Sequence, residues 1–183
     1  MQAAVESSRV GLEDFDEVVR LYWQCVHRFI LASTRDADAA QTLTQDCFLR
    51  AYFARGAFRC QANVKTWLMH IAVNLVRDFG RNRRLQFWKR LNASATNPGD
   101  VGDHLPAAAV SPEDQALLKE QVQIVWQASQ SLPRRQRTVF LLRFVEEMDI
   151  LEIAAATGMK EGTVKTHLFR ALQAVRKRLG GSK

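Results

Sequence analysis

The stretch from Val64 to Arg84 places side chains that bind phosphates and bases at helical spacing. Folded as a helix, it would have one polar side bearing guanidinium, ammonium, imidazole and amide groups. Such groups contact the phosphates of nucleic acids and the edges of their bases. Taken alone, the same pattern also fits the solvated basic surface of an ordinary helical bundle. The polar residues are Lys65, His70, Asn74, Arg77, Asp78 and Arg81, followed by Arg83 and Arg84.

A second group of candidate contact residues lies near the C-terminus. Asp149 can cap a short helix over 150–157, Gly158 can adopt a left-handed turn, and a second helix begins within 159–162. Helix, glycine turn and second helix is the helix-turn-helix plan, in which the second helix enters the major groove. A plain helical hairpin is the alternative. The outward residues of the second helix are Lys165, Thr166, His167, Phe169 and Arg170, and Arg176, Lys177 and Arg178 extend the basic surface.

The chemistry expected of these groups is binding and not catalysis. The sequence has no Gly-rich phosphate loop, no closely spaced set of His and carboxylate residues, and no nucleophile with an evident base. Cys25, Cys47 and Cys60 are odd in number and widely spaced, so a disulfide framework is not expected. Cys25 and His27 would point apart on a helix and make a weak metal candidate. We therefore expect no catalytic residue, no metal and no cofactor.

The charge of the chain narrows the class of partner. Its 183 residues carry a formal net charge of +7. This favours a polyanionic partner, either nucleic acid or an anionic membrane surface. No apolar run is long enough to span a bilayer, and the N-terminus lacks the pattern of a signal peptide. We expect a cytoplasmic protein.

Three amphipathic helices would position the first group of polar residues. Apolar side chains recur every three or four residues from Phe15 to Ile30, and a second helix follows a polar turn over 33–38. The second helix is expected to bury Leu43, Cys47, Phe48, Ala51 and Tyr52 and to expose Gln41, Gln45, Asp46 and Arg50. The third is expected to bury Trp67, Leu68, Ile71, Ala72, Leu75, Val76 and Phe79. These helices define an N-terminal domain over 12–90.

A change in composition after Leu91 separates this domain from a second one. Residues 91–111 are rich in Ala, Asn, Gly, Asp and Pro and lack an apolar stripe, which predicts a flexible linker. The C-terminal domain, 112–183, would begin with a helix capped at Ser111 and running to about Ser131. The next helix, after Pro133, would bury Val139, Phe140, Leu142 and Phe144, and the last would bury Val164, Leu168, Leu172 and Val175. The predicted fold class is all-α, with two small helical domains and a C-terminal helix-turn-helix.

Five segments in this order resemble a bacterial sigma factor of the extracytoplasmic-function (ECF) group of the sigma-70 family, over about Phe15 to Leu179. In the N-terminal half they are TQDCFLRAY and WLMHIAVNLVRDFGRNRR, and in the C-terminal half LPRRQRTVFLLRF, EIAAATGM and EGTVKTHLFRA. Any one of these could occur by chance, whereas their order around one linker is specific. The resemblance implies a sigma factor that binds core RNA polymerase and directs promoter-specific transcription initiation.

The resemblance also assigns roles to residues. It implies a polymerase-docking surface at Gln45, Asp46 and Arg50. It implies that a loop over 56–63 captures a flipped base of the minus-ten promoter element. The residues implied to contact this element are Phe58, Arg59, Asn63, Lys65, His70, Asn74, Arg77, Asp78, Arg81 and Arg84. It implies contact with the minus-thirty-five element by Lys160, Lys165, Thr166, His167, Phe169 and Arg170. The implied partners are core polymerase, promoter DNA and an anti-sigma factor, with no small-molecule substrate.

Some features depart from this family or fit another class. The acidic pair that the family usually carries before its Gln-Asp-x-Phe motif is replaced here by Gln41 and Thr42, which affects the expected strength of the polymerase contact. The segment GTVKTHL is also similar in sequence to quorum-sensing-type response regulators. An operator-binding regulator would explain the helix-turn-helix but leave the stretch 64–84 without a role. A sigma-mimicking adaptor that binds the anti-sigma protein without DNA is disfavoured by the basic surfaces.

Overall fold

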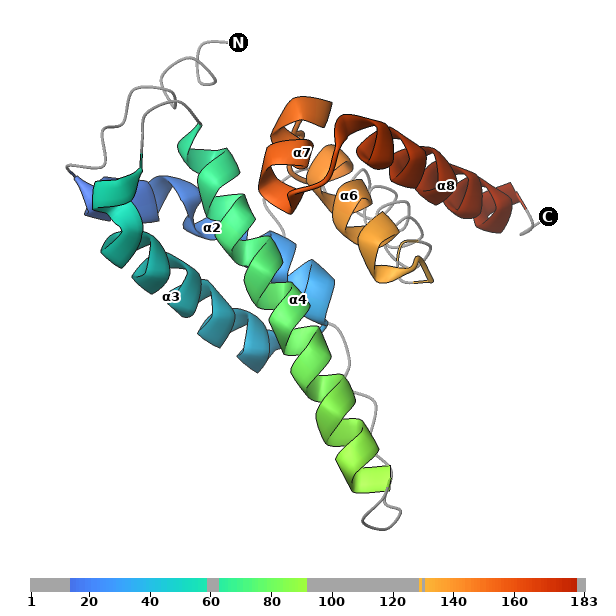
Figure 1. Ribbon diagram of the computed structural model, residues 1–183, viewed down its shortest axis with the longest axis horizontal. Helices are drawn as coiled ribbons and strands as arrows, with labels where there is room; N and C mark the ends of the chain where they lie inside the picture. Colours follow the sequence, from blue (N-terminus) through green and yellow to red (C-terminus); the bar gives the residue numbers. More distant parts are fainter. Residues whose placement is uncertain (1–13, 59–62, 92–128, 130, 181–183) are drawn as a thin grey trace, which may run out of the picture.

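The computed structural model describes residues 14–58, 63–91, 129 and 131–180, and every regular element in these ranges is helical (Figure 1). All-α architecture is therefore confirmed. The predicted linker and the predicted helix from Pro112 to Ser131 lie almost entirely outside the described residues. The N-terminal helices are α2 (Phe15–Thr34), α3 (Ala37–Ala54), the short 3-10 helix η1 (Arg55–Ala57) and α4 (Val64–Leu91). The C-terminal helices are α6 (Arg134–Phe144), α7 (Ile150–Thr157) and α8 (Glu161–Gly180).

Aspartate caps and a left-handed residue join the first two helices. The side chain of Asp14 accepts a hydrogen bond from the backbone N–H of Glu17 at 3.2 Å, and that of Asp36 accepts from Ala39 at 2.9 Å. These bonds satisfy N–H groups that have no partner within the helix. Arg35 ends α2 with φ 56°, in the left-handed region, so that the chain reverses within two residues.

The N-terminal helices α2, α3 and α4 pack around one core. Val26, Phe29 and Leu68 are fully buried, and the rings of Trp23 and Phe48 stack with centroids 5.5 Å apart. Tyr52 departs from expectation, since it is 42 % exposed and lies beneath the Arg55 guanidinium at 3.6 Å. Tyr52 lies in the last turn of α3, where its ring packs edge-on against that of Phe15 at the margin of the core, with centroids 5.3 Å apart.

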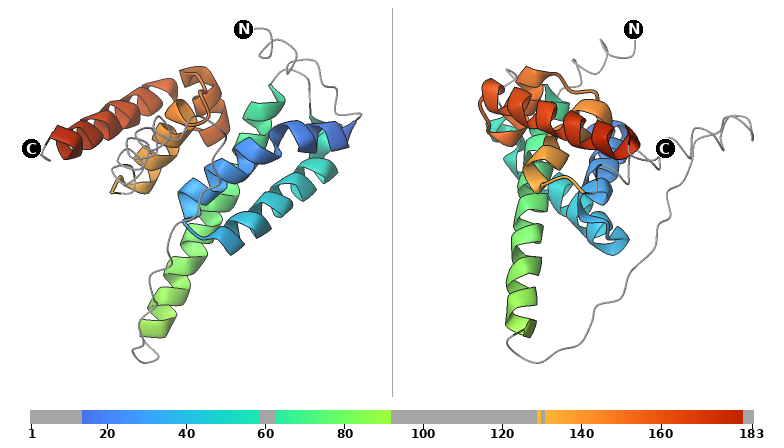
Figure 2. Two further views of the ribbon diagram at one scale, coloured as in Figure 1. Left: turned by 180° about the vertical axis from the view of Figure 1, so that it is seen from behind. Right: turned by 90° about the vertical axis from the view of Figure 1, so that its right-hand side faces the viewer.

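Helix α4 is longer and more deeply buried than its sequence predicts. It continues to Leu91, and its C-terminal half extends past the other helices in both views of Figure 2. Met69 and Val73 were not expected in the core, yet their exposure is 0 % and 8 %. They are buried because α4 contacts α7 as well as α2 and α3. A single amphipathic stripe accounts for only one of these two buried surfaces.

The C-terminal helices form the predicted helix-turn-helix. Asp149 and Glu152 make a reciprocal capping box at the start of α7, with N–H···O distances of 2.8 and 2.9 Å. Gly158 follows α7 with φ 69° and ψ 18°, a conformation that costs glycine little. Phe144 was expected to be buried but is 48 % exposed, whereas Leu141 is 1 % exposed. Phe144 is the last residue of α6, and its ring packs on that of Phe140, with centroids 4.8 Å apart.

The N- and C-terminal helices share one apolar core. Buried residues of α2, α3 and α4 form a continuous cluster with Val139, Leu142, Met148, Ile153 and Ala156. A smaller cluster lies between α6 and α8. The sequence predicted two helical domains. In the structure α7 packs directly on α4, so the apolar core continues from one set of helices into the other. None of the described helices has the length and apolar character needed to cross a membrane.

Candidate nucleic-acid interface

The exposed face of α8 carries most of the residues predicted to contact duplex DNA. Lys165, Thr166, Phe169 and Arg170 are all exposed, with Phe169 at 61 %. Lys160 is also exposed, just before α8 begins. The Thr166 hydroxyl donates to the Gly162 carbonyl at 2.8 Å, which leaves its oxygen able to accept. Cation, hydroxyl and apolar groups therefore share one surface of a helix preceded by a glycine turn.

His167 differs from its neighbours on α8. It is half-buried, and its Nδ1 atom is buried without a hydrogen-bond partner among the described residues. Burial lowers the pKa of this imidazole, and the nearby positive charges of Arg135 and Arg170 lower it further. His167 is therefore only partly exposed, unlike the other predicted contact residues of α8, and its contact with DNA stays a prediction.

The polar face of α4 is divided between solvent and the C-terminal helices. Arg77 is exposed, and Arg81 pairs with Asp78 at 3.6 Å with 73 % of its side chain exposed. The side chain of Arg84 lies outside the described residues. The side chain of Arg81 is thus open to a large partner, whereas Lys65 and His70, nearer the N-terminus of α4, contact the C-terminal helices.

His70 links two parts of this engaged surface. Its Nδ1 lies 3.0 Å from the carbonyl oxygen of Ala156 in α7, and its Nε2 lies 3.1 Å from Nδ2 of Asn74. Both contacts are satisfied when Nδ1 donates to the carbonyl and Nε2 accepts from the amide. In this conformation His70 contacts the C-terminal domain and Asn74 contacts His70, and both residues remain predicted contacts for promoter DNA.

Glu146 lies at the centre of the polar contact between the domains. Its carboxylate is 0 % exposed and receives hydrogen bonds from Nε and Nη2 of Arg28, both at 3.0 Å. Lys65 donates to its backbone carbonyl and lies 4.0 Å from its carboxylate. The bonds to Glu146 raise the pKa of Arg28. The sequence did not point to Glu146 or Arg28. A glutamate in the turn between two helices looks the same in the sequence whether its carboxylate is exposed to solvent or buried against an arginine.

The predicted base-capture loop over 56–63 is only partly described. Phe58 packs on Trp67 with ring centroids 4.8 Å apart, so its ring is part of the core edge in this conformation. Asn63 precedes α4 and its side chain accepts from the N–H of Lys65 at 2.9 Å. Arg59 lies outside the described residues. Asn63 thus has a local structural role in addition to any contact with DNA.

The predicted polymerase-docking face lies on the exposed side of α3. Gln45 is exposed, and Arg50 pairs with Asp46 one helical turn away at 2.9 Å. Sequence reasoning overlooked two apolar neighbours, Leu49 and Phe53, which are 55 % and 77 % exposed. Their spacing of four residues, offset from the buried positions of α3, was the available signal. Large exposed apolar side chains beside a charged pair are typical of protein-binding surfaces.

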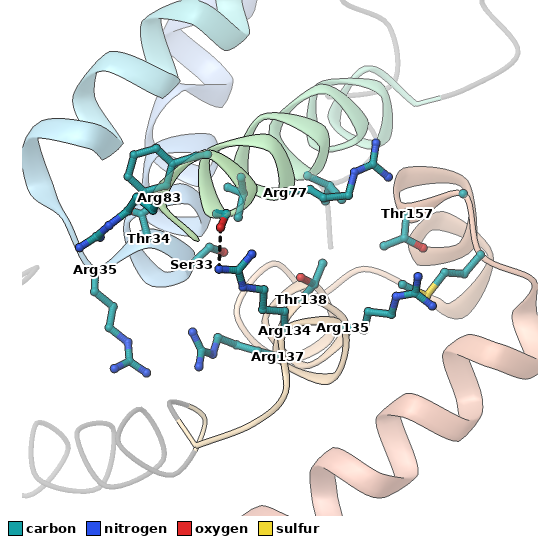
Figure 3. A pocket seen from close by; sticks show the side chains of 16 residues that line it. Ser33, Thr34, Arg35, Arg77, Arg83, Arg134, Arg135, Arg137, Thr138 and Thr157 are labelled. Atoms are coloured by element: carbon teal, nitrogen blue, oxygen red, sulfur yellow. Dashed lines mark hydrogen bonds between the residues drawn. The ribbon is translucent and has the colours of Figure 1, made fainter. Parts of the chain in front are cut away.

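A cleft of about 800 Å³ lies between α4 and the C-terminal helices. Figure 3 shows arginine side chains reaching it from both sides. Nη2 of Arg134 donates to the carbonyl of Gly80 in α4 at 2.9 Å, which ties α6 to α4 across the cleft. The arginines that line the cleft are Arg35, Arg77, Arg83, Arg134, Arg135 and Arg137.

The two described cysteines have the environment of structural thiols. Burial raises the pKa of Cys25 to about 11 and that of Cys47 to about 12. Such thiols stay protonated near neutral pH and are poor nucleophiles. Cys60 lies outside the described residues. Within the described ranges, no three His, Cys, Asp or Glu side chains are grouped so as to hold a metal ion.

Comparison with known proteins gives matches to both halves of the chain. Residues 16–86 match the family described as Sigma-70 region 2, and residues 123–175 match Sigma-70, region 4. The RNA polymerase sigma-H factor of Pseudomonas aeruginosa is 33 % identical over 90 % of this chain and 86 % of its own length. The ECF RNA polymerase sigma factor SigW of Bacillus subtilis is 28 % identical over 96 % of this chain and 94 % of its own length.

A solved structure has the same arrangement of helices. The sigma factor RpoE of Bartonella quintana, determined in complex with the anti-sigma factor NepR, aligns with a TM-score of 0.72. The alignment covers 93 % of this chain and 99 % of the other, at 23 % sequence identity. This likeness establishes the similarity of fold.

Proposed function

The chain belongs to the ECF group of the sigma-70 family of RNA polymerase sigma factors. We propose that different surfaces of the chain bind the two promoter elements and core polymerase. A sigma factor directs RNA polymerase to promoters and starts transcription there. The main observation behind this proposal is that one chain has two basic surfaces of different shape. One is a helix-turn-helix with an exposed second helix, and the other is the long basic helix α4.

The second helix, α8, reads the minus-thirty-five element as duplex. Arg170 and Lys165 are exposed cations that can reach guanine in the major groove, and Phe169 can contact a thymine methyl group. Thr166 and Lys160 contact the neighbouring backbone or bases. His167 supports the helix from within the domain, because its buried Nδ1 faces away from solvent.

The long helix α4 opens and holds the minus-ten element. Arg77, Arg81 and Arg84 attract the phosphates of the separated strand, and Asn74 and Asp78 contact its bases. Lys65, His70 and Asn74 make contacts to or near the C-terminal helices in the described conformation. These helices must therefore move away before the N-terminal half of α4 can meet DNA. Phe58, Arg59 and Asn63 border the base that leaves the stack.

Helix α3 docks on core polymerase. Gln45, Asp46 and Arg50 supply polar and charged contacts, and Leu49 and Phe53 supply apolar area beside them. Exposed Leu and Phe side chains strengthen this assignment in a chain that lacks the usual acidic pair at positions 41 and 42. Together they could offset the affinity that the missing carboxylates would contribute.

Regulation and location follow from the same premise. We propose that the chain is a non-catalytic subunit that works in the cytoplasm, where RNA polymerase acts. We also propose that an anti-sigma protein controls it, by binding between its two domains and holding them in an arrangement that cannot engage polymerase. The domain boundaries 12–90, 91–111 and 112–183 are part of this proposal.

Reconstituted transcription tests the proposed function. The purified chain is added to core polymerase and a library of genomic promoter fragments, with core polymerase alone as the control. We expect a stable complex with core and transcripts from a defined subset of promoters. Failure to associate with core polymerase at all would overturn the sigma assignment. Association without promoter selection would remove the roles assigned to α4 and α8.

A further inference from the structure

The exposed face of α8 includes a short side chain whose hydrogen-bonding direction is set by the helix itself. The Thr166 hydroxyl donates to the carbonyl oxygen of Gly162, one turn earlier, at 2.8 Å. A hydroxyl has one proton and two acceptor lone pairs, so this bond uses its only donor. Toward a molecule that approaches from solvent, the Thr166 oxygen therefore acts as an acceptor.

The position of Thr166 gives this bond a significance that similar bonds lack. Thr44 donates in the same way to Ala40 at 2.7 Å, but Thr44 is 0 % exposed, so there the bond satisfies a buried hydroxyl. Thr166 is exposed, and water could satisfy its hydroxyl equally well. The helix thus orients the hydroxyl of Thr166 on the surface that is proposed to enter the major groove.

Gly162 leaves the space beside Thr166 open. Side chains of an α-helix lean toward its N-terminus, so the side chain of residue 166 lies over residue 162. A Cβ added to Gly162 would meet no atom of the described residues within 4 Å, and the backbone there is not left-handed. Nothing in the described part of the chain therefore requires glycine at this position, where it is a poor helix former. The missing side chain keeps the Thr166 oxygen accessible from solvent.

The exposed neighbours of Thr166 on this face cannot accept a hydrogen bond. Lys165 and Arg170 carry only donors, and Phe169 is apolar. In the major groove guanine presents acceptors and thymine a methyl group, which suit these neighbours, whereas adenine and cytosine present amino groups. Thr166 can accept from an amino group while it keeps its bond to Gly162. Donating to a base instead would only exchange one hydrogen bond for another.

We propose that Thr166 selects adenine or cytosine at one position of the minus-thirty-five element, by accepting a hydrogen bond from the exocyclic amino group of the base. Thr166 determines specificity, and Gly162 is a positioning residue that gives the base access. This inference rests on the proposed recognition of duplex by α8 and adds the class of base group that is recognised. Glu161, exposed in the first turn of α8, is a second acceptor near this face, so the test has to separate the two.

Selection from a duplex library tests the proposed class of base. Holoenzyme containing the full chain selects sequences from DNA randomised across the minus-thirty-five region, with Thr166→Val, Thr166→Ser and Glu161→Gln in parallel. Valine keeps the shape of threonine without the hydroxyl, and serine keeps the hydroxyl. We expect the unmodified chain, Thr166→Ser and Glu161→Gln to prefer adenine or cytosine at one position of one strand. In Thr166→Val that preference should fall about fivefold, as expected for loss of one hydrogen bond between neutral groups.

Base analogues identify the recognised atom. At the selected position adenine is replaced by purine, which lacks the amino group, or by deazaadenine, in which carbon replaces N7. For cytosine the matching analogue is a pyrimidinone without the N4 amino group. Loss of the amino group should weaken holoenzyme binding about fivefold for the unmodified chain and should not weaken it for Thr166→Val. Deazaadenine should bind as adenine does, and weaker binding of deazaadenine alone would overturn the proposal, because Thr166 would then donate to N7.

Side chains of increasing size at position 162 test the access that glycine provides. Gly162→Ala and Gly162→Gln introduce good helix formers at a position with open space, so the temperature of thermal unfolding should not fall. Holoenzyme binding to the selected duplex should nevertheless weaken several-fold with alanine and further with glutamine, and the preference for the amino group should decrease. Unchanged binding in both variants would overturn the positioning role of Gly162.

The selection also separates this inference from the proposed function. A holoenzyme that selects no minus-thirty-five sequence would overturn the role of α8 and this inference with it. Selection of a defined sequence that Thr166→Val leaves unchanged would overturn the inference alone. Loss of the preference in Glu161→Gln and not in Thr166→Val would also overturn it, and would assign the contact to Glu161.

Discussion

Arg170 and Arg178 are exposed cations on the same helix, and we expect them to act differently. Arg170 lies in the N-terminal half of α8 and is placed to reach base edges, whereas Arg178 lies near its end. Arg170→Ala should cost about 1–3 kcal/mol and change the preference for particular bases. Arg178→Ala should weaken binding to every sequence and flatten its salt dependence. Holoenzyme binding to single-base promoter variants at several salt concentrations measures both. Equal effects on every promoter would contradict the assignment.

Asn74 is predicted to act in strand opening. Its amide contacts His70 at 3.1 Å on the polar face of α4, so Asn74→Ala removes a bond worth about 0.5–1.5 kcal/mol and should leave the fold intact. Open complex should fall, because extruding a base costs a few kcal/mol that the bound strand must offset. A premelted promoter bubble should restore most of the activity. Normal permanganate reactivity in both Asn74→Ala and Arg81→Ala would show that α4 is only a scaffold.

His167 should make stability depend on pH. Its pKa is lowered in the folded chain, so the unfolded chain, with a pKa of about 6.5, binds the proton first as pH falls. The contribution of neutral His167 is therefore complete above about pH 6.5 and is lost as pH falls below that value toward the folded pKa. His167→Gln should flatten this part of the profile. Chemical denaturation between pH 5 and 8 measures it, and identical profiles for the two proteins would contradict the prediction.

At the scale of an element, α3 presents one surface to solvent and one to the core. Asp46 is on the exposed surface and pairs only with Arg50 within the described residues, so Asp46→Arg should cost the fold about 0.3–0.5 kcal/mol. Core polymerase affinity should fall further, since like charges brought together at an interface cost several kcal/mol. Titration of labelled core polymerase measures the change.

A charge reversal elsewhere on α3 provides the control for this test. Asp38 is exposed at the other end of the helix, more than two turns from Asp46. Asp38→Arg makes the same change in net charge and should leave core affinity close to that of the unmodified chain. If Asp46→Arg and Asp38→Arg weakened core binding equally, the effect would be one of net charge, and the docking surface would lie elsewhere.

At the scale of the whole molecule, Glu146 holds the domains in contact. Glu146→Gln removes the buried negative charge that binds Arg28 and Lys65. The closed form should lose about 1–3 kcal/mol, because Arg28 is half exposed and recovers hydration when released. Small-angle scattering should show a larger radius of gyration. Binding of single-stranded minus-ten DNA to the isolated chain should increase, since Lys65, His70 and Asn74 become available.

Glu147 offers a matched control for Glu146. It is the next residue and is exposed, and its φ is 56°. Because glutamine has nearly the shape of glutamate, the substitution changes charge and not the steric demand at this left-handed position. Glu147→Gln should leave both the scattering curve and the binding of single-stranded DNA unchanged. A scattering curve for Glu146→Gln identical to that of the unmodified chain would mean that the apolar contact between α4 and α7 suffices to hold the domains together.

Local sequence patterns were enough to predict most of the described helices and their polar faces. Periodicity located α2, α3, α6 and α8, and the sequence of Asp149, short helix and Gly158 located the helix-turn-helix, because caps and left-handed turns are local properties. The exposed residues Lys165, Thr166, Phe169 and Arg170 were also predicted correctly. Each of these conclusions depends on neighbours within about four residues along the chain.

Which polar residues are exposed and which contact another helix depends on how the helices pack. Met69 and Val73 are buried, and His70 contacts the carbonyl of Ala156, because α7 packs on a second side of α4. The Glu146 carboxylate meets Arg28 from a position 118 residues away, and no local pattern marks such a pair. The arginine-lined cleft likewise arises only when α4 and α6 face each other. Side-chain periodicity shows that a helix has an apolar side, whereas packing determines how many of its sides meet a partner.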